Sequence, residues 1–294
     1  MSAPDVVEFR SPLATEGRPG LAVTYGSDSM ESIERLLPLV DLVEVSPDTL
    51  VVLGERGPYI PEPALQRLAL LGARVPLIVH GVGLSIGTYD GCCESYLQVL
   101  DQLFERVPVA WHSEHLAFTT VDGEHLGTML PLPRTDDVVE MISRRVEHIR
   151  LRYGVPFLLE HVVHLIPDPG GRYSHAAFLN SLAKESGCGL LIDAYNLDCD
   201  RVNGVLDVDT FLRELDPAAV VEIHLAGGVE YGGLQVDVHS RVVPDSVLDL
   251  CSAGALATWP ALRAMTYEYL PEAEAAIGVD TIASELVRLR NRLL

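Results

Sequence analysis

Two hydrophobic periodicities alternate about eight times along this chain. Short runs rich in Val, Ile and Leu, which are typical of buried strands, are each followed by a longer segment with apolar residues at helical spacing. We expect strands at Gly20 to Tyr25, Leu42 to Val45, Pro76 to His80, Val109 to His115, Pro156 to Val162, Gly189 to Asp193, Val220 to Leu225 and Ala264 to Tyr269. The spacing predicts helices near Met30 to Pro38, Pro63 to Leu71, Cys93 to Arg106, Thr135 to Tyr153, His175 to Glu185, Asp207 to Leu215, Pro244 to Ala253 and Thr281 to Leu294.

Several of these strands are apolar along almost their whole length, for example PLIVH, GLLID and VVEIH. Such strands are buried on both faces, as in parallel sheets. Eight strand-then-helix units in 294 residues fit one (β/α)8 TIM-like barrel of the α/β class, similar to xylose isomerase. No low-complexity segment or Gly/Ser linker divides the chain, so we expect a single domain over residues 1–294 with a barrel core that starts near residue 20.

Composition narrows the class of partner. An apolar content of 48% is ample for a core. With 21 Lys and Arg against 42 Asp and Glu, the net charge of -21 repels phosphate backbones and anionic membranes, which argues against nucleic acid and membrane partners. The first residues show no signal-peptide pattern and no apolar run reaches membrane-spanning length, so we expect a cytoplasmic protein. Five cysteines without a CxxC spacing favour neither a disulfide framework nor a zinc ribbon.

A barrel of this kind carries its chemistry at the C-terminal ends of its strands. Polar side chains capable of binding a metal stand at those ends in six of the expected strands: His80, His115, Glu160, Asp193 followed by Asn196, His224 and Glu268. Asp237 and His239 follow strand seven and are two residues apart, so on extended backbone both side chains point to one side. We therefore expect these nine residues to converge at one mouth of the barrel.

Glu160, Asp193 and Glu268 stand at the ends of apolar strands, so their carboxylates are expected to be buried. They need compensating positive charge, because ionised groups are almost never buried unpaired. The chain has one lysine, Lys184, in an expected helix. Metal cations are the natural compensation, and imidazole with carboxylate but no thiolate suits iron, manganese or zinc. Nine ligands are too many for one ion and suffice for two or three, with Glu160 or Glu268 as a bridge.

The remaining polar residues on the strands have ordinary interpretations. Strand alternation turns His112 and His161 away from the lumen. Glu222 shares the parity of His224 and is expected to form structural hydrogen bonds or to support a ligand. The other histidines fall in loops or helices and are expected at the surface or at helix caps: His125, His148, His164 and His175.

The order of short motifs along the chain resembles the multinuclear non-heme iron-dependent oxidative enzymes, a family that includes the methanobactin-biosynthesis oxidase. The resemblance covers roughly residues 20 to 270 and is carried by the joint order of the motifs. The motifs are HGVGLS (80–85), SEHL (113–116), LLE (158–160), DAYN (193–196), EIHLAG (222–227), DVH (237–239) and a glutamate on the last strand, Glu268.

This resemblance implies a TIM-like barrel with two or three irons, in mixed Fe2+ and Fe3+ states, that activates O2. The substrate it implies is a residue, often a cysteine, of a ribosomally made precursor peptide, usually presented by a separate partner protein. It also implies that the nine residues named above are the iron ligands, with no further catalytic residue. The chain departs from the family pattern at Glu44 to Pro47, His161, Tyr195 and Gly228, positions that neighbour the ligands and tune the outcome of the reaction.

Two other functions remain open at this point. One is a divalent-metal isomerase or hydrolase of the xylose-isomerase-like barrels, which also place His, Asp and Glu at strand ends. Sugar isomerases of that kind generally use a catalytic lysine, and Lys184 lies in a helix. The other is a barrel that has lost catalysis and serves as a binding subunit, although such a barrel would be expected to have lost some of the nine candidates.

Overall fold

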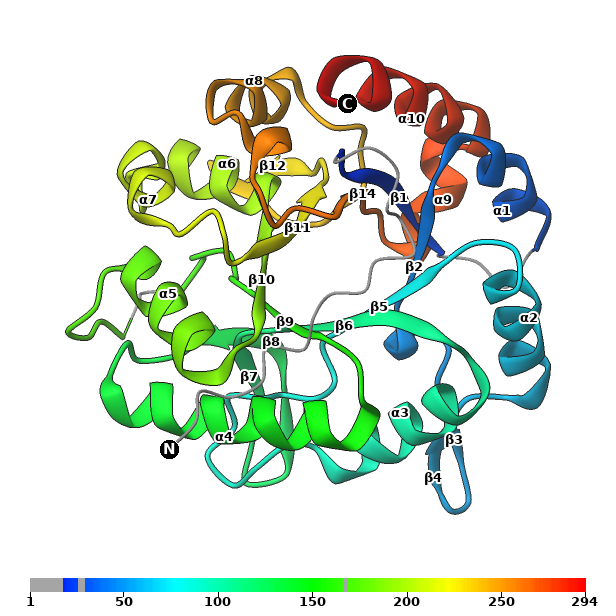
Figure 1. Cartoon of the computed structure of the whole chain (residues 1–294), viewed down its shortest axis with the longest axis horizontal. Helices are drawn as coiled ribbons and strands as arrows, with labels where there is room; N and C mark the ends of the chain where they lie inside the picture. The colour runs from blue at the N-terminus through cyan, green and yellow to red at the C-terminus, as the bar shows by residue number, and fades with distance from the viewer. Residues whose placement is uncertain (1–17, 26–29, 167–168) are drawn as a thin grey trace.

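The computed structural model describes residues 18–25, 30–166 and 169–294. Eight parallel strands close into a barrel in the order β1–β14–β11–β10–β9–β6–β5–β2 (Figure 1). Their bounds are β1 (Gly20–Tyr25), β2 (Leu42–Val45), β5 (Leu77–Gly81), β6 (Val109–His115), β9 (Phe157–Glu160), β10 (Gly189–Asp193), β11 (Val220–Leu225) and β14 (Ala264–Tyr267). The (β/α)8 barrel predicted from the alternating pattern is therefore confirmed.

Helices surround the barrel (Figure 1): α1 (Met30–Leu36), α2 (Glu62–Gly72), α3 (Glu94–Arg106), α4 (Asp136–Tyr153), α5 (His175–Ser186), α6 (Ala194–Val202), α7 (Val208–Glu214), α8 (Asp245–Ala253), α9 (Pro271–Ile277) and α10 (Val279–Leu293). Hydrophobic periodicity did not predict α6 or α9. Within the described ranges, no helix combines the length and apolar content needed to cross a bilayer.

Three hairpins were also absent from the predicted pattern, and all three leave the C-terminal ends of barrel strands. They are β3–β4 (Val52–Gly54 and Gly57–Tyr59), β7–β8 (Ala117–Val121 and Glu124–Pro131) and β12–β13 (Val229–Tyr231 and Leu234–Val236). Their strands are short or largely exposed, so they lack the apolar alternation that marks a buried strand.

Capping residues set the two ends of helix α4, whose range the pattern predicted well. Helix α4 begins after Thr135, whose hydroxyl accepts from the backbone N–H of Val138 at 3.4 Å. Arg150 and Arg152 occupy its last turn, where cations favour the helix dipole. The helix ends at Gly154, which adopts the left-handed conformation with φ of 68°. The predicted range therefore differs from the helix only by its capping residue.

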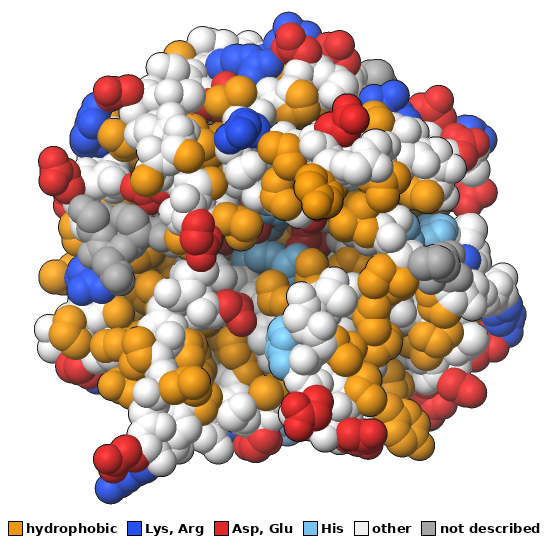
Figure 2. Space-filling model, turned by 180° about the vertical axis from the view of Figure 1, so that it is seen from behind, with side chains coloured by type: hydrophobic (Ala, Val, Ile, Leu, Met, Phe, Trp, Pro, Cys, Tyr) orange, Lys and Arg blue, Asp and Glu red, His pale blue; other side chains and the backbone are white. Residues whose placement is uncertain are grey.

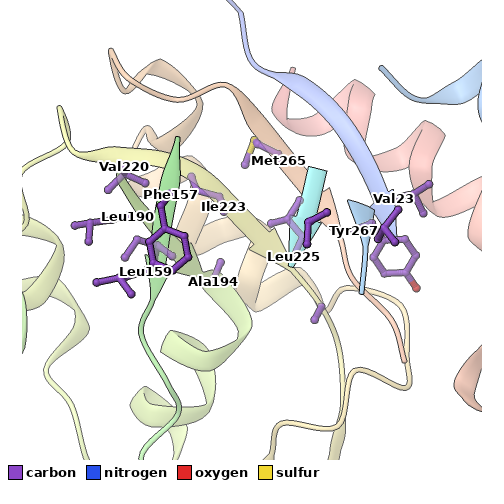
Figure 3. Packing of buried hydrophobic residues seen from close by; sticks show 14 of the residues in the cluster. Val23, Phe157, Leu159, Leu190, Ala194, Val220, Ile223, Leu225, Met265 and Tyr267 are labelled. Carbon is purple, nitrogen blue, oxygen red and sulfur yellow. The ribbon is translucent and has the colours of Figure 1, made fainter. Parts of the chain in front are cut away.

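The larger hydrophobic cluster fills the space between the barrel wall and the helices. Figure 3 shows part of it, including the side chains of Val23, Leu190 and Ile223, which belong to the same cluster as buried residues of the surrounding helices. These residues are fully buried. Successive residues of a strand point to opposite faces, so the residues that alternate with these along each strand face the barrel lumen.

A smaller apolar cluster occupies the lower part of that lumen. It consists of Ala22, Leu42, Ile78, Trp111, Leu158, Leu191, Val221 and Ala264, with Ala110 packed against it. Each of the eight barrel strands contributes one of the buried members. This cluster, called the lower layer below, closes the barrel floor, so any site in the lumen must lie toward the C-terminal ends of the strands.

Candidate metal centre

Two residues beyond the lower layer, the inward positions of β5, β9 and β10 become polar. Ile78 is followed by His80 on β5, and Leu158 is followed by Glu160 on β9. The same step leads from the lower layer to Asp193 at the end of β10. His80, Glu160 and Asp193 are all buried, with at most 3% of their surface exposed. Strand alternation thus directs these side chains into the lumen, as predicted.

His80 and His115 meet over the Glu160 carboxylate. The Nε2 atoms of both rings lie 3.1 Å from Oε2 of Glu160. The opposite nitrogen of each ring is held: Nδ1 of His80 contacts the Ser113 hydroxyl at 2.9 Å, and Nδ1 of His115 contacts the Gly81 carbonyl at 3.0 Å. The carbonyl can only accept, so His115 Nδ1 carries a proton, and Nε2 is the ring nitrogen left to bind an ion on the side of Glu160.

His224 lies between acidic side chains from β2, from β9 and from the segment after β14. Its Nδ1 is 2.7 Å from Oε2 of Glu268 and 3.8 Å from Oε1 of Glu160. Its Nε2 is 2.9 Å from Oε2 of Glu44. Glu268 follows β14, which ends at Tyr267 rather than at the predicted Tyr269.

His239 joins the centre from the segment after β13. Its Nδ1 lies 3.0 Å from Oε2 of Glu268, and its Nε2 lies 2.5 Å from Oδ1 of Asp237 and 3.4 Å from Oδ2 of Asp193. The predicted extended backbone is wrong here, because β13 ends at Val236 and His239 has a φ of 39°. A positive φ is uncommon outside glycine and costs free energy, so the surrounding structure holds this residue in place.

Asn196 was predicted to follow the end of strand six, and the structure shows that it does so on a helix that the sequence pattern did not predict. It lies in the first turn of α6, because Oδ1 of Asp193 caps that helix. The carboxylate oxygen accepts from the backbone N–H groups of Tyr195 at 2.6 Å and of Asn196 at 2.8 Å. Asp193 therefore uses one oxygen as a helix cap and turns the other toward His239.

The chemistry of these side chains fits divalent cations. Six buried nitrogen and oxygen atoms of the candidate ligands make no well-formed hydrogen bond: His80 Nε2, Glu160 Oε2, Asp193 Oδ2, Asn196 Oδ1, Asp237 Oδ1 and His239 Nε2. All but the Asn196 oxygen lie within 3.4 Å of another atom of this group. Buried polar atoms are normally satisfied by hydrogen bonds, so unsatisfied nitrogen and oxygen atoms this close together call for a ligand. Four sets of three residues bring donor atoms within 4.8 Å of one another: Glu44, His80 and His224; His80, His115 and Glu160; Glu160, Asp193 and His224; Asp193, His239 and Glu268.

The charges of the buried side chains also indicate that the centre needs a bound cation. Burial raises the pKa of Glu160 to about 8 and also raises the pKa of Glu44. Burial opposes a charge on His224, but the carboxylates of Glu44 and Glu268 outweigh it and hold the pKa of His224 well above its ordinary value. Among the described residues, no arginine or lysine forms an ion pair with these carboxylates, and Lys184 is exposed on α5.

Glu44 is the residue of the centre that the sequence did not single out. It is 1% exposed near the end of β2, where its Oε1 accepts from the Thr24 hydroxyl at 3.1 Å and its Oε2 faces His224. The rule that located the other residues would have found it, because Glu44 stands two residues after Leu42 of the lower layer. A carboxylate on the far nitrogen of a ligating histidine fixes its tautomer and orientation.

The structure places the other candidate side chains outside this centre. His112 packs among Phe104, Tyr153 and Phe157, outside the lumen, and burial lowers its pKa to about 3. Glu222 accepts from the Trp111 indole at 2.7 Å and the Thr266 hydroxyl at 2.5 Å. Its Oε1 also lies 3.6 Å from Nε2 of His224, so Glu222 links the lower layer to the centre. The remaining histidines belong to none of the four ligand sets, nor do the five cysteines: His125, His148, His161, His164 and His175.

Figure 2 shows a hollow near the middle of one face of the molecule, with histidine and acidic side chains on its floor and hydrophobic side chains around it. The exposed apolar residues of the loops after the barrel strands include Tyr89, Leu126, Tyr231 and Leu270. The centre is therefore reached from an opening with an apolar border.

Solved structures with the same fold are xylose-isomerase-like barrels. A xylose isomerase domain containing protein from Salmonella typhimurium LT2 matches with a TM-score of 0.63 at 14% identity, over 93% of this chain and 96% of that chain. Endonuclease IV from Thermus thermophilus matches with a TM-score of 0.53 at 14% identity, over 92% and 99%. At this identity the likeness shows the fold alone, and it confirms the predicted class.

Curated relatives carry the name UPF0276 protein. One from Caulobacter vibrioides is 31% identical over 74% of this chain and 75% of its own length. Another from Neisseria gonorrhoeae is 29% identical over 84% and 87%. A family model described as RiPP precursor modification enzyme MbnB/TglH/ChrH, for ribosomally made and then modified peptides, matches residues 20–265. The resemblance predicted from the motifs is thus confirmed, and the chain belongs to the MbnB/TglH/ChrH family of RiPP precursor modification enzymes.

Proposed function

We propose that this protein uses two or three irons, in mixed Fe2+ and Fe3+ states, and O2 to oxidise a residue of a ribosomally made precursor peptide. The observation that carries the proposal is the group of six buried nitrogen and oxygen atoms without a well-formed hydrogen bond at one mouth of the barrel, in a chain of a peptide-modifying family. We take cysteine as the modified residue, because a thiolate is itself a good ligand for iron.

The donor sets divide the centre into positions for separate ions. His80, His115 and Glu160 would hold one ion, and Asp193, His239 and Glu268 would hold another. Asp237 has an oxygen beside His239 of the second set and would add to it. Asn196, three residues after Asp193, has a buried oxygen without a hydrogen bond, and we assign it to the same position. Glu160 and His224 lie between the two positions, which suits Glu160 as a bridge. When bound, the irons supply one-electron redox chemistry and the activation of O2.

The protein's own groups orient the ligands and limit access by water. Gly81 and Ser113 hold the far nitrogens of two imidazoles, so that both Nε2 atoms face Glu160. Glu44 accepts from Nε2 of His224, so Nδ1 faces Glu160 and Glu268 and would bind an ion there in exchange for its proton. The lower layer closes the floor, so the peptide must enter through the apolar-bordered opening (Figure 2).

The peptide substrate and its delivery are part of the proposal. An extended peptide can place one side chain in the hollow while neighbouring apolar residues contact the border of the opening. We place a separate partner protein at this face to present the peptide, and we place the reaction in the cytoplasm, where ribosomal peptides are made.

The test is metal analysis followed by an oxygen assay. Protein purified and reconstituted with Fe2+ under anaerobic conditions should retain two or three irons per chain, measured by inductively coupled plasma mass spectrometry. Addition of O2 and a cysteine-containing peptide encoded beside this protein should consume O2 and change the peptide mass. Protein that retains no iron, or that leaves O2 and the peptide unchanged, would contradict the proposal. Zinc or manganese with O2-independent turnover would instead favour a metal-dependent isomerase or hydrolase.

A further inference from the structure

The β12–β13 hairpin is tied to helix α6 by side-chain hydrogen bonds. Asn203, directly after α6, donates from Nδ2 to the backbone carbonyl of Gln235 at 2.9 Å and accepts at Oδ1 from the backbone N–H of Gln235 at 2.8 Å. Nε2 of Gln235 donates to the Tyr195 hydroxyl at 2.5 Å. Tyr195 and Asn203, at opposite ends of one short helix, are therefore both hydrogen-bonded to Gln235 of β13.

Tyr195 also fills the space beside Gly228, the third residue after β11. Its hydroxyl donates to the Val236 carbonyl at 3.3 Å. A Cβ at Gly228 would lie 2.5 Å from the Tyr195 hydroxyl oxygen and 2.4 Å from the Val236 carbonyl oxygen. Position 228 therefore has no room for a side chain, because the tyrosine and β13 already occupy that space.

These contacts join the two segments that bring ligands to one side of the centre. Tyr195 stands between Asp193 and Asn196 in the chain, and Val236 directly precedes Asp237. His239 has other backbone anchors, because its carbonyl accepts from the Leu270 N–H at 3.0 Å. Asp237 lies between these two attachments and outside any strand.

We propose that Tyr195 is a positioning residue, which with Asn203 holds β13 so that Asp237 faces the ion position formed by Asp193 and His239. This inference rests on the proposed metal centre. The phenol does not touch the ion. It fixes the residue before Asp237, so the carboxylate is in place before the ion arrives and little ordering remains to be done on binding.

The test uses Fe2+ alone as the probe, titrated anaerobically against a competing chromophoric chelator. Tyr195→Phe keeps the ring in its space and removes the hydroxyl. We expect about tenfold weaker Fe2+ binding at one of the ion positions. This is the low end of the loss in metal affinity caused by substituting residues that support metal ligands. Co2+ should show a changed d–d absorption spectrum in the same variant. Asn203→Ala should weaken the same position, because it releases β13 from the other end of α6.

Tyr153→Phe is the matched control. Its hydroxyl donates to the Leu97 carbonyl at 3.3 Å, the same length as the Tyr195 bond, but it lies on α4 away from the centre. We expect a similar loss of thermal stability and an unchanged Fe2+ affinity. A double-mutant cycle completes the test: in an Asp237→Ala background, Tyr195→Phe should cause no further weakening, because its effect passes through Asp237.

The outcomes separate this inference from the metal centre itself. Wild-type protein that binds Fe2+ tightly, with Tyr195→Phe and Asn203→Ala variants of equal affinity and spectrum, would overturn the positioning role alone. Additive weakening in the Asp237→Ala background would also overturn it. Wild-type protein that binds no metal would overturn the metal centre and this inference together.

Discussion

The lower layer and the metal centre occupy the same lumen, two residues apart on β5, β9 and β10. The lower layer consists of apolar side chains, whereas the centre consists of acidic side chains and imidazoles. Ile78, Leu158 and Leu191 fill the floor with hydrocarbon, and the next inward residues on those strands are His80, Glu160 and Asp193. Backbone geometry and burial are nearly the same in both layers. The lower layer gains stability chiefly from the burial of hydrocarbon, whereas the centre buries polar atoms that stay unsatisfied without a ligand.

This difference indicates where the chain favours function over stability. A lumen filled with hydrocarbon to its top would fold without a ligand, and its side chains would satisfy one another. The chain instead places at least six acids in or beside the upper lumen: Glu44, Glu160, Asp193, Glu222, Asp237 and Glu268. Such a layer is expected to weaken the metal-free fold and to recover stability when cations bind.

Glu160→Leu would extend the lower layer upward, and it should have the largest effect. It removes the proposed bridge and one member of two ligand sets. We expect loss of Fe2+ from more than one position and loss of peptide oxidation, because even changes around ligands cost about 10- to 100-fold in affinity. The metal-free variant should be at least as stable as metal-free wild type, since a buried carboxyl is replaced by hydrocarbon of similar volume.

Iron content by mass spectrometry and urea unfolding of both metal-free proteins would measure these two effects. A Glu160→Leu protein that keeps its irons would show that Glu160 is not a ligand. A variant that unfolds much more easily without metal would show that Glu160 is part of the structural core instead.

Leu158→Ala is the converse change, in the lower layer. Leu158 is fully buried, and its truncation should lower the free energy of unfolding by about 2–5 kcal/mol. Iron stoichiometry in the folded protein should remain that of wild type. The control is Leu151→Ala on α4, where the side chain is 79% exposed and the expected change is within about 0.5 kcal/mol. Loss of iron from folded Leu158→Ala protein would mean that the two layers are not independent.

Glu44→Leu tests the boundary between the layers, because it removes the acceptor of the His224 Nε2 proton. We expect about 10- to 100-fold weaker Fe2+ binding, the range for second partners of ligating histidines. Glu44→Gln keeps an oxygen acceptor without the charge, so its affinity should fall between the leucine variant and wild type. Chelator competition measures both, and equal affinity in all three proteins would contradict a role for Glu44 in orienting His224.

The strand-end residues could be predicted from sequence because alternation is a property of the backbone. The rule placed His80, Glu160 and His224 in the lumen and turned His112 away from it. Applied to every strand, it would also have given Glu44. The resemblance had drawn attention to its segment only as a departure from the family pattern.

The loop contributions could not be predicted in the same way. Asp237 and His239 approach each other through a turn with positive φ at His239, and no pattern of apolar residues signals such a turn. Asn196 lies on a helix because Asp193 caps it directly at the strand end, which leaves no loop for a sequence pattern to mark. The Tyr195 contact with Gly228 depends on the packing of the hairpin, so it needed coordinates.

Ser113→Ala should give the smallest change and the finest test of the comparison. Ser113 lies above Trp111 of the lower layer, and its hydroxyl donates to the Val79 carbonyl at 3.2 Å while Nδ1 of His80 donates to it at 2.9 Å. Without the hydroxyl, the His80 ring keeps its place but loses the bond that fixes its tautomer. A neutral hydrogen bond contributes about 1 kcal/mol, which corresponds to roughly fivefold weaker Fe2+ binding. Ser181→Ala on α5 removes a comparable bond to the Ala177 carbonyl and should leave Fe2+ affinity unchanged. Equal Fe2+ affinity in the two serine variants would show that orientation of His80 comes from packing alone.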